Sequence, residues 1–475
     1  MKKLAIISII SASTAIASAD IVTYPAPEGA NLNASYTVEV SDDGLMWHPV
    51  DAYSVKVDEV LNARHTPREV SMAYFDCDTI TKVRVISNKE NIMSAKVRPL
   101  SYGITPEIKG DTLLFSVSPS QLMSVEVNGD IFNNLQLFAN TPDNNAPSPK
   151  QLKKLSKDKN YIYFGPGIHK IDTLRVQSGQ TVYVAGGAVV QGNIEVHDAQ
   201  NVRILGRGMV YPNQMGIHIA RSKNVEVDGL FTTQCAVGAS DSVNINNVKV
   251  MSWYGWGDGF NVFASSNVKY NNVWARTSDD CTTIYATRKG HEGSCSNILM
   301  ENSVLWADVA HPIMIGLHGS FNPETPDSIV GATYRNLDIL DHSENQMDYQ
   351  GCLAISCGDN NLVKDITFED IRVENFRKGQ LVNMRIVFNK KYCQFPGRGI
   401  ENVTFRNVSY KGDNATLSII SGYDENRKIK NILFQNLTIN DKTISDSMPE
   451  KPKWYKTSDF ANMYIGEHVE NVTFE

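Results

Sequence analysis

Cysteine is scarce in this sequence, and no two cysteines form a motif. The 475 residues include seven cysteines at irregular spacings, with no Cys-x-x-Cys pair. This pattern argues against a disulfide scaffold and gives no sign of a zinc site. Because the number is odd, at least one thiol is unpaired. Cys352 and Cys357 are close enough in sequence to form either a local disulfide or two free buried thiols.

Clusters of basic residues are also missing. The chain has 45 Lys and Arg against 52 Asp and Glu, a formal net charge of −7. Because phosphate binding needs clustered cations, we expect no nucleic acid partner. The net negative charge also disfavours binding of a strongly anionic substrate, although a local cationic patch would overcome this repulsion.

A long hydrophobic run occurs only at the N-terminus. The basic Met1-Lys2-Lys3, an apolar run over residues 4–10 and Ala17-Ser18-Ala19 have the order of a secretory signal peptide, residues 1–19. No later segment approaches the ~20 apolar residues that cross a bilayer. We therefore expect an exported protein, periplasmic or secreted, with no membrane span.

The first part of the expected mature chain alternates apolar and polar residues. Between residues 20 and 145 the alternation comes in short runs such as Tyr36-Thr37-Val38-Glu39-Val40. A period of two in short segments is typical of an antiparallel β-sandwich. Sequence rich in Pro, Asn and Lys follows, so residues 146–160 are predicted to be a linker.

Residues 161–475 repeat one short pattern. A polar residue precedes an apolar-x-apolar strand in Asn224-Val225-Glu226-Val227, Asn267-Val268-Lys269-Tyr270 and Asn402-Val403-Thr404-Phe405. Because stripes of Leu and Ala at helical spacing are missing, the repeat predicts a right-handed parallel β-helix. Asparagine suits its corners because it tolerates the left-handed conformation and can hydrogen-bond from coil to coil. The predicted fold is all-β, an antiparallel β-sandwich followed by a β-helix.

Three aspartates interrupt the repeat at one place. Asp258 stands 21 residues before Asp279, which is followed directly by Asp280. One coil has about this length and coils stack ~4.8 Å apart, so Asp258 should lie nearly above the pair. Carboxyl groups this close cannot all ionise at low cost, so at least one should stay protonated near neutrality. A protonated acid beside an ionised base can cleave a glycosidic bond.

These motifs resemble a known group of enzymes. Asp258-Gly259-Phe260-Asn261, Asp279-Asp280-Cys281 and the later His311 are similar to the signature of the β-helical glycoside hydrolases. This group comprises the polygalacturonase family with its dextranase and isopullulanase relatives, and the resemblance covers residues 160 to 475. It implies inverting hydrolysis without a metal or cofactor, with Asp280 as the general acid and with Asp258 and Asp279 activating water.

Two segments depart from the polygalacturonase pattern. Ala310-His311-Pro312 lacks the glycine before the histidine, and Gly351-Cys352-Leu353-Ala354-Ile355-Ser356 lacks the cationic tripeptide that grips a uronate carboxylate. The sequence therefore favours a neutral α-glucan as the polysaccharide or oligosaccharide substrate. Arg288 and Arg385 could replace the missing cations, so a pectic uronan is the alternative.

Seven residues besides the aspartates are expected to bind sugar, since aromatic faces stack on sugar rings and polar groups fix their orientation. They are Asn261, Trp256, Tyr285, Arg288, His311, His318 and Arg385.

Two other functions stay open. One is calcium-dependent β-elimination, which needs a carboxylate cage and an Arg base that the motifs do not show. The other is non-catalytic carbohydrate binding, with the aspartates as corner residues.

Overall fold

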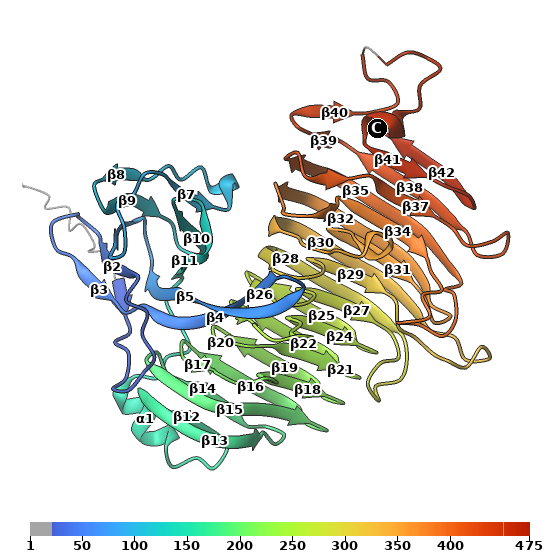
Figure 1. Ribbon diagram of the computed structural model, residues 1–475. Coiled ribbons are helices and arrows are strands. Elements are labelled where there is room, and N and C mark those ends of the chain that lie inside the picture. The colour runs from blue at the N-terminus through green and yellow to red at the C-terminus, as the bar shows by residue number, and fades with distance from the viewer. Residues whose placement is uncertain (1–20, 450) are drawn as a thin grey trace, which may run out of the picture.

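The computed structural model describes residues 21–449 and 451–475, which form two β-rich parts lying side by side (Figure 1). A β-sandwich, blue to teal, precedes a long right-handed parallel β-helix whose coils run from green to red. The predicted fold class is confirmed. The predicted signal peptide, residues 1–19, lies outside the described residues.

The sandwich has two sheets with a shared apolar core. One sheet has the order β1-β5-β11-β10-β7 with β4 paired to β5, and the other has the order β3-β2-β6-β9-β8. All pairs are antiparallel except β5 with β11, which run parallel. Phe75, Val83 and Leu137 are buried between the sheets. The strands are β1 (Ile21–Thr23), β2 (Tyr36–Ser41), β3 (His48–Val50), β4 (Tyr53–Leu61), β5 (Arg64–Cys77), β6 (Thr81–Ser87), β7 (Ala95–Arg98), β8 (Glu107–Lys109), β9 (Thr112–Val117), β10 (Gln121–Val127) and β11 (Asp130–Asn140).

The expected linker, residues 146–160, contains a short helix, α1 (Pro149–Leu155). Ser148 caps it by accepting from the backbone N–H of Gln151, while the Gln151 side chain accepts from the backbone N–H of Ser148 at 2.9 Å. Pro149 occupies the first helical position, where its missing N–H costs nothing. This capping box is the sequence signal that predicts a helix start.

Three parallel sheets form the walls of the β-helix, and the long strands bend from one sheet into the next. The first sheet contains β12 (Tyr161–Phe164), β14 (Thr181–Val184), β16 (Gln200–Gly206), β19 (Lys223–Asp228), β22 (Asp241–Asn246), β25 (Ser266–Asn271), β28 (Cys295–Ala307), β30 (Ser328–Asp341), β32 (Leu362–Glu374), β35 (Gly399–Lys411), β38 (Ile429–Gln435) and β42 (Val469–Phe474). The second sheet shares β28, β30, β32 and β35 and adds β13 (Gly167–Arg175), β15 (Ala188–His197), β17 (Met209–Val210), β20 (Phe231–Thr232), β23 (Lys249–Met251), β26 (Trp274–Thr277) and β39 (Leu437–Ile439).

The third sheet, called the site sheet below, continues from the end of β15. Its strands are β18 (Ile217–Ala220), β21 (Cys235–Gly238), β24 (Phe260–Phe263), β27 (Thr282–Tyr285), β29 (Ile313–Gly316), β31 (Leu353–Cys357), β34 (Val382–Ile386), β37 (Ser418–Ser421) and β41 (Met463–Ile465). The remaining elements are β33 (Gly379–Gln380), β36 (Ala415–Thr416), β40 (Lys442–Ile444), α2 (Thr457–Phe460) and two 3-10 turns, Leu100–Tyr102 and Met347–Tyr349.

Like side chains stack on like side chains inside the β-helix. Phe368, Phe405, Phe434 and Phe474 form a column with ring centroids 4.9, 4.7 and 4.8 Å apart. The parallel register puts equivalent residues of successive coils directly above one another, so the repeat in the sequence becomes a continuous apolar core. Each coil buries its apolar face only against its neighbours.

Asparagine holds the corners, as predicted. Asn267, Asn402 and Asn431 have φ of 55°, 56° and 60°, in the left-handed region. Their amides bond from coil to coil: Asn297 Nδ2 donates to Asn267 Oδ1 at 2.6 Å, and Asn431 Nδ2 donates to Asn402 Oδ1 at 3.0 Å. A second ladder runs from Asn336 through Asn302 to Asn271.

All seven cysteines lie within the described residues, and each is buried and free. Cys352 and Cys357 therefore follow the free-thiol alternative. No helix in the described part of the chain is long and apolar enough to cross a membrane.

A buried arginine of the β-helix binds the sandwich. Arg276, on β26, donates from Nε and Nη2 to Asp308 at 2.9 and 3.1 Å. It also donates to Asn134 Oδ1 at 3.0 Å and to the Ile131 carbonyl at 2.7 Å, both on β11 of the sandwich. Its guanidinium lies 4.1 Å from the centre of the Trp306 ring. The Arg276 and Asp308 side chains are fully buried, so Asp308 holds the guanidinium in the position from which it binds β11.

Candidate active site

The three aspartates lie at the N-terminal ends of neighbouring strands of the site sheet. Asp258 precedes β24 by two residues, and Asp280 precedes β27 by two residues. The backbone N–H of Gly259 donates to the Asp280 carbonyl at 2.9 Å, so one turn stacks on the next. The register between β24 and β27 corresponds to a coil of 22 residues. Asp258 is therefore level with Asp280, a member of the Asp279–Asp280 pair above which it was expected.

Asp258 is held by a short chain of buried side chains. Asn261 Nδ2 donates to Asp258 Oδ2 at 2.8 Å, and Thr283 Oγ1 donates to Asn261 Oδ1 at 2.7 Å. Asn261 is 1 % exposed, so its buried amide fixes the orientation of the Asp258 carboxyl group. Burial, and next repulsion from Asp280, raise the pKa of Asp258 to about 7.

Asp280 is buried and accepts from three donors. The backbone N–H of His311 lies 3.1 Å and its Nδ1 lies 2.6 Å from Asp280 Oδ1, and the Tyr285 hydroxyl donates to Oδ2 at 3.1 Å. On the other side of the ring, Nε2 of His311 faces the Tyr349 carbonyl, which can only accept. Burial alone would lower the pKa of His311, but Asp280 and the Tyr349 carbonyl raise it.

Asp279 has fewer partners and is partly exposed. Its Oδ1 accepts from the backbone N–H of Asp280 at 2.9 Å, and no other partner of this carboxyl occurs among the described residues. Burial, followed by repulsion from Asp258 and Asp280, raises the pKa of Asp279 well above its ordinary value. Asp279 and Asp258 are therefore the two aspartates whose protonated form this site favours. Within the described chain, no three His, Cys, Asp or Glu side chains are arranged to hold a metal ion.

A cavity of about 310 Å³ opens over the aspartates. Trp256, at its rim, is 74 % exposed, and its φ of 66° is a conformation that bulky residues rarely adopt. Such strain persists only where the surrounding structure enforces it, often at functional sites. Besides the three aspartates, the lining residues are Trp256, Phe263, Tyr285, Arg288, Lys289, Leu317, His318, Tyr349 and Tyr392.

The predicted site residues divide into those that line this cavity and those that do not. Trp256, Tyr285, Arg288 and His318 line it. The edge of the His318 ring meets the Tyr285 ring with centroids 4.9 Å apart, which fixes the wall behind Asp280. Asn261 and His311 are buried and hold aspartates in place.

Arg385 lies farther along the site sheet. The register from Tyr285 runs through Gly316 and Ser356 to Arg385, three coils away, a rise of ~14 Å at ~4.8 Å per coil. Arg385 lines a separate cavity of about 240 Å³, which shares Leu317 and Tyr349 with the cavity at the aspartates. The two cavities therefore lie along one cleft.

Five cavity residues were missed by the sequence reasoning, and two of them, Phe263 and Leu317, lie on or directly after strands of the site sheet. Lys289, Tyr349 and Tyr392 reach the cavity from connections between strands. The rings of Tyr349 and Tyr392 stack with centroids 4.9 Å apart. No spacing rule predicts where such loops fold, although the adjacent Arg288-Lys289 pair was visible in the sequence.

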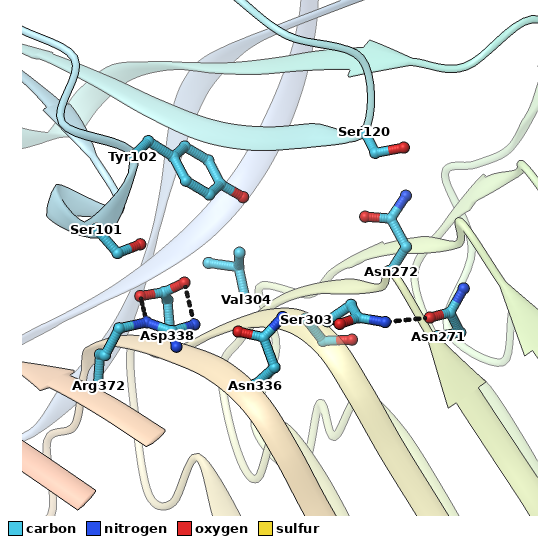
Figure 2. Close-up of a pocket in the computed structure, with 11 residues that line it drawn as sticks. Ser101, Tyr102, Ser120, Asn271, Asn272, Ser303, Val304, Asn336, Asp338 and Arg372 are labelled. Atoms are coloured by element: carbon cyan, nitrogen blue, oxygen red, sulfur yellow. Dashed lines mark hydrogen bonds and ion pairs between the residues drawn. The ribbon is translucent and has the colours of Figure 1, made fainter. Parts of the chain in front are cut away.

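A larger cavity, of about 570 Å³, lies between the sandwich and the β-helix (Figure 2). Tyr102 and Ser120 border it from the sandwich, opposite the amide ladder of Asn336, Asn302 and Asn271. Its only carboxyl in the described residues, Asp338, is bound by Arg372 at 2.7 and 2.8 Å. With its one carboxyl neutralised, this cavity lacks an acid–base pair, and the candidate active site is the cavity at the aspartates.

Comparisons with known proteins bear on the fold and the family. A probable endopolygalacturonase D from Neosartorya fischeri is 24% identical over 225 residues, 46% of this chain, and the match spans only 42% of that relative's length. The solved structure of Dex49A from Penicillium minioluteum is 15% identical with a TM-score of 0.57, covering 94% of this chain and 96% of that one. A family 28 exopolygalacturonase from Yersinia enterocolitica is 12% identical with a TM-score of 0.46, covering 82% and 96%. The model of the glycosyl hydrolases family 28 matches residues 168–453, more than half of the chain, and the chain belongs to that family.

Proposed function

We propose that the protein is an exported glycosidase that hydrolyses O-glycosidic bonds of a polysaccharide with inversion. The observation that carries the proposal is the cluster of Asp258, Asp279 and Asp280 in one cavity, where burial and mutual repulsion raise the pKa of Asp258 and of Asp279. One carboxyl gives its proton to the leaving oxygen as the bond from the anomeric carbon to that oxygen breaks. Another takes a proton from the water whose oxygen attacks the anomeric carbon from the opposite face. The sum is one water added across one glycosidic bond.

The hydrogen bonds support a division of roles that differs from the one implied by the resemblance. Asp279 is the general acid in our proposal, because its pKa is raised well above the ordinary value and it is partly exposed. Asp280 is the base, because His311 and Tyr285 donate to it. Asp258 positions the attacking water from the neighbouring coil.

Unpaired cations along the cleft support an acidic polysaccharide, a pectic uronan, over the neutral α-glucan that the sequence favoured. Arg288 and Lys289 border the aspartate cavity, and Arg385 borders the next one. None of the three has a carboxylate within 4 Å in the described chain; Arg385 donates to the Asp348 carbonyl at 2.7 Å. A guanidinium without a carboxylate partner is suited to bind a sugar carboxylate.

Replacing Arg385 with Ala is expected to raise KM for de-esterified polygalacturonic acid by about tenfold or more, since hydrogen bonds to charged groups contribute ~1.5–3 kcal/mol. Activity is measured as reducing ends released from polygalacturonic acid, dextran and pullulan. The exposed Lys157, replaced with Ala, is the matched control for loss of one positive charge. Hydrolysis of dextran or pullulan, with KM unchanged in Arg385→Ala, would instead support the neutral α-glucan. Measurable glycan binding without hydrolysis of any polymer would support a carbohydrate-binding β-helix.

A further inference from the structure

The loop between β23 and β24 carries both Trp256 and Asp258. On either side of its apex, the carbonyls of Tyr254 and Gly257 each accept from a buried serine hydroxyl. At the apex, neither Gly255 nor Trp256 makes a hydrogen bond to any other described residue. The φ of 66° at Trp256 is strained, and such strain persists only where the surrounding structure enforces it. Contacts from outside the loop must therefore hold the apex.

The β4–β5 hairpin of the sandwich supplies these contacts. It extends across the β-helix, blue in Figure 1, and β4 contacts β23 and β26. A Cβ at Gly255 would lie 3.5 Å from Nε2 of His65, and apart from the two chain neighbours no other described residue comes within 4 Å of it. The imidazole therefore covers the apex. Lower on the hairpin, the Lys56 ammonium lies 5.8 Å from the centre of the Trp253 ring, near the start of the loop.

The ring of His65 is fixed within the hairpin. Its Nδ1 bonds to the carboxyl group of Asp58, whose other oxygen accepts from the backbone N–H of Thr66 at 3.0 Å. The Asp58 side chain is fully buried, so it holds the imidazole in one orientation. With Nδ1 engaged, Nε2 is the free nitrogen of the ring, and it is the atom nearest to the apex at Gly255.

We propose that the β4–β5 hairpin is a brace that holds Trp256 at the rim of the active-site cavity, with His65 as the positioning residue. The sandwich then raises the affinity for substrate without touching it, because a ring that is already oriented costs less free energy to order when a sugar stacks on it. Asp258 does not depend on the brace, since the Asn261 amide and the turn at Gly259 hold it separately. This inference rests on the proposed function and gives the sandwich a part in it.

The position of Trp256 can be measured without substrate. The protein is labelled with 5-fluorotryptophan, and the fluorine NMR signal of Trp256 is identified by its loss in Trp256→Phe. In His65→Ala this signal is expected to shift and to narrow, because the apex becomes mobile. His65→Asn should act in the same way, since its amide can bond to Asp58 but is too short to cover Gly255. His65→Gln, whose amide reaches the place of Nε2, should keep a signal close to that of the wild type.

Kinetics separate the brace from a general loss of stability. His65→Asn is expected to raise KM for the polymer that the wild type hydrolyses by about threefold to tenfold with kcat unchanged, the pattern of lost substrate binding. Trp256→Ala should raise KM as well. When the two changes are combined, KM should rise no further than in Trp256→Ala, because both act through one ring. His48→Ala is the matched control, since His48 is exposed on β3 of the sandwich.

Two results would overturn the brace. One is a Trp256 signal in His65→Asn that equals that of the wild type, with thermal unfolding confirming that the variant is folded. The other is a KM in the combined variant that exceeds that of Trp256→Ala by the full effect of His65→Asn. If no polymer yields reducing ends, the proposed function fails, and the fluorine signal alone decides whether the hairpin holds Trp256.

Discussion

Replacing Asp279 with Asn is expected to lower kcat by about 10²–10⁴-fold, the range for loss of general acid catalysis. Asn has nearly the same shape and can keep an oxygen near the backbone N–H of Asp280, 2.9 Å from Asp279 Oδ1 in the wild type. It cannot donate the proton that the leaving oxygen needs. Because the pKa of the wild-type carboxyl is raised well above normal by burial and by Asp258 and Asp280, the neutral Asn should not destabilise the fold.

The measurement is reducing-end release under saturating substrate, with thermal unfolding as the check on folding. Asp42→Asn is the matched control, since Asp42 is exposed in the sandwich. If kcat falls by less than tenfold in Asp279→Asn but collapses in Asp280→Asn, the roles are those implied by the resemblance. Undiminished activity in both variants would contradict the catalytic role of the pair.

Replacing Arg276 with Met is expected to cost about 3–5 kcal/mol of unfolding free energy, because it leaves a buried charge without its main partner. Arg276 and Asp308 are both fully buried, and the nearest remaining cation is Arg377, 3.6 Å from Asp308. The same change removes the bonds to Asn134 and the Ile131 carbonyl. The contact between sandwich and β-helix should therefore weaken together with the fold.

Thermal unfolding, followed by circular dichroism and tryptophan fluorescence, measures this effect. Arg221→Met is the matched control, because Arg221 pairs with Asp198 at 2.7 Å on the surface. An exposed ion pair contributes only ~0–1 kcal/mol to the free energy of unfolding. The double variant Arg276→Met with Asp308→Leu should recover part of the loss, since no charge stays buried. Equal small losses for Arg276→Met and Arg221→Met would show that the buried Arg276 does not stabilise the fold or its contact with the sandwich.

The repeat made the β-helix and its corners predictable. Asn267 and Asn402 adopt the left-handed conformation expected of them, because backbone strain at a corner is a local property that the residue type reveals. The stacking of Asp258 over the Asp279–Asp280 pair was predictable from the spacing of the motifs. Which member of the pair it meets, Asp280, depends on the register of β24 with β27, which is fixed by packing across the whole coil.

Other features depend on how distant segments meet. Asn261 was expected to contact sugar, but it is buried and its amide donates to Asp258 instead. Tyr349 and Tyr392 reach the cavity on loops from two further coils. The parallel pairing of β5 with β11 joins strands far apart in the sequence. No local sequence pattern predicts these long-range contacts, since they are decided by tertiary packing.

The central claim is that two carboxyls act on opposite faces of one sugar, and the stereochemistry of the product tests it most directly. Proton NMR of the first minutes of hydrolysis of an α-linked polymer shows which anomer is released before mutarotation mixes the two forms. Attack of water from the face opposite the leaving group predicts the β anomer as the first product. Initial release of the α anomer, or of an unsaturated sugar from β-elimination, would contradict the account.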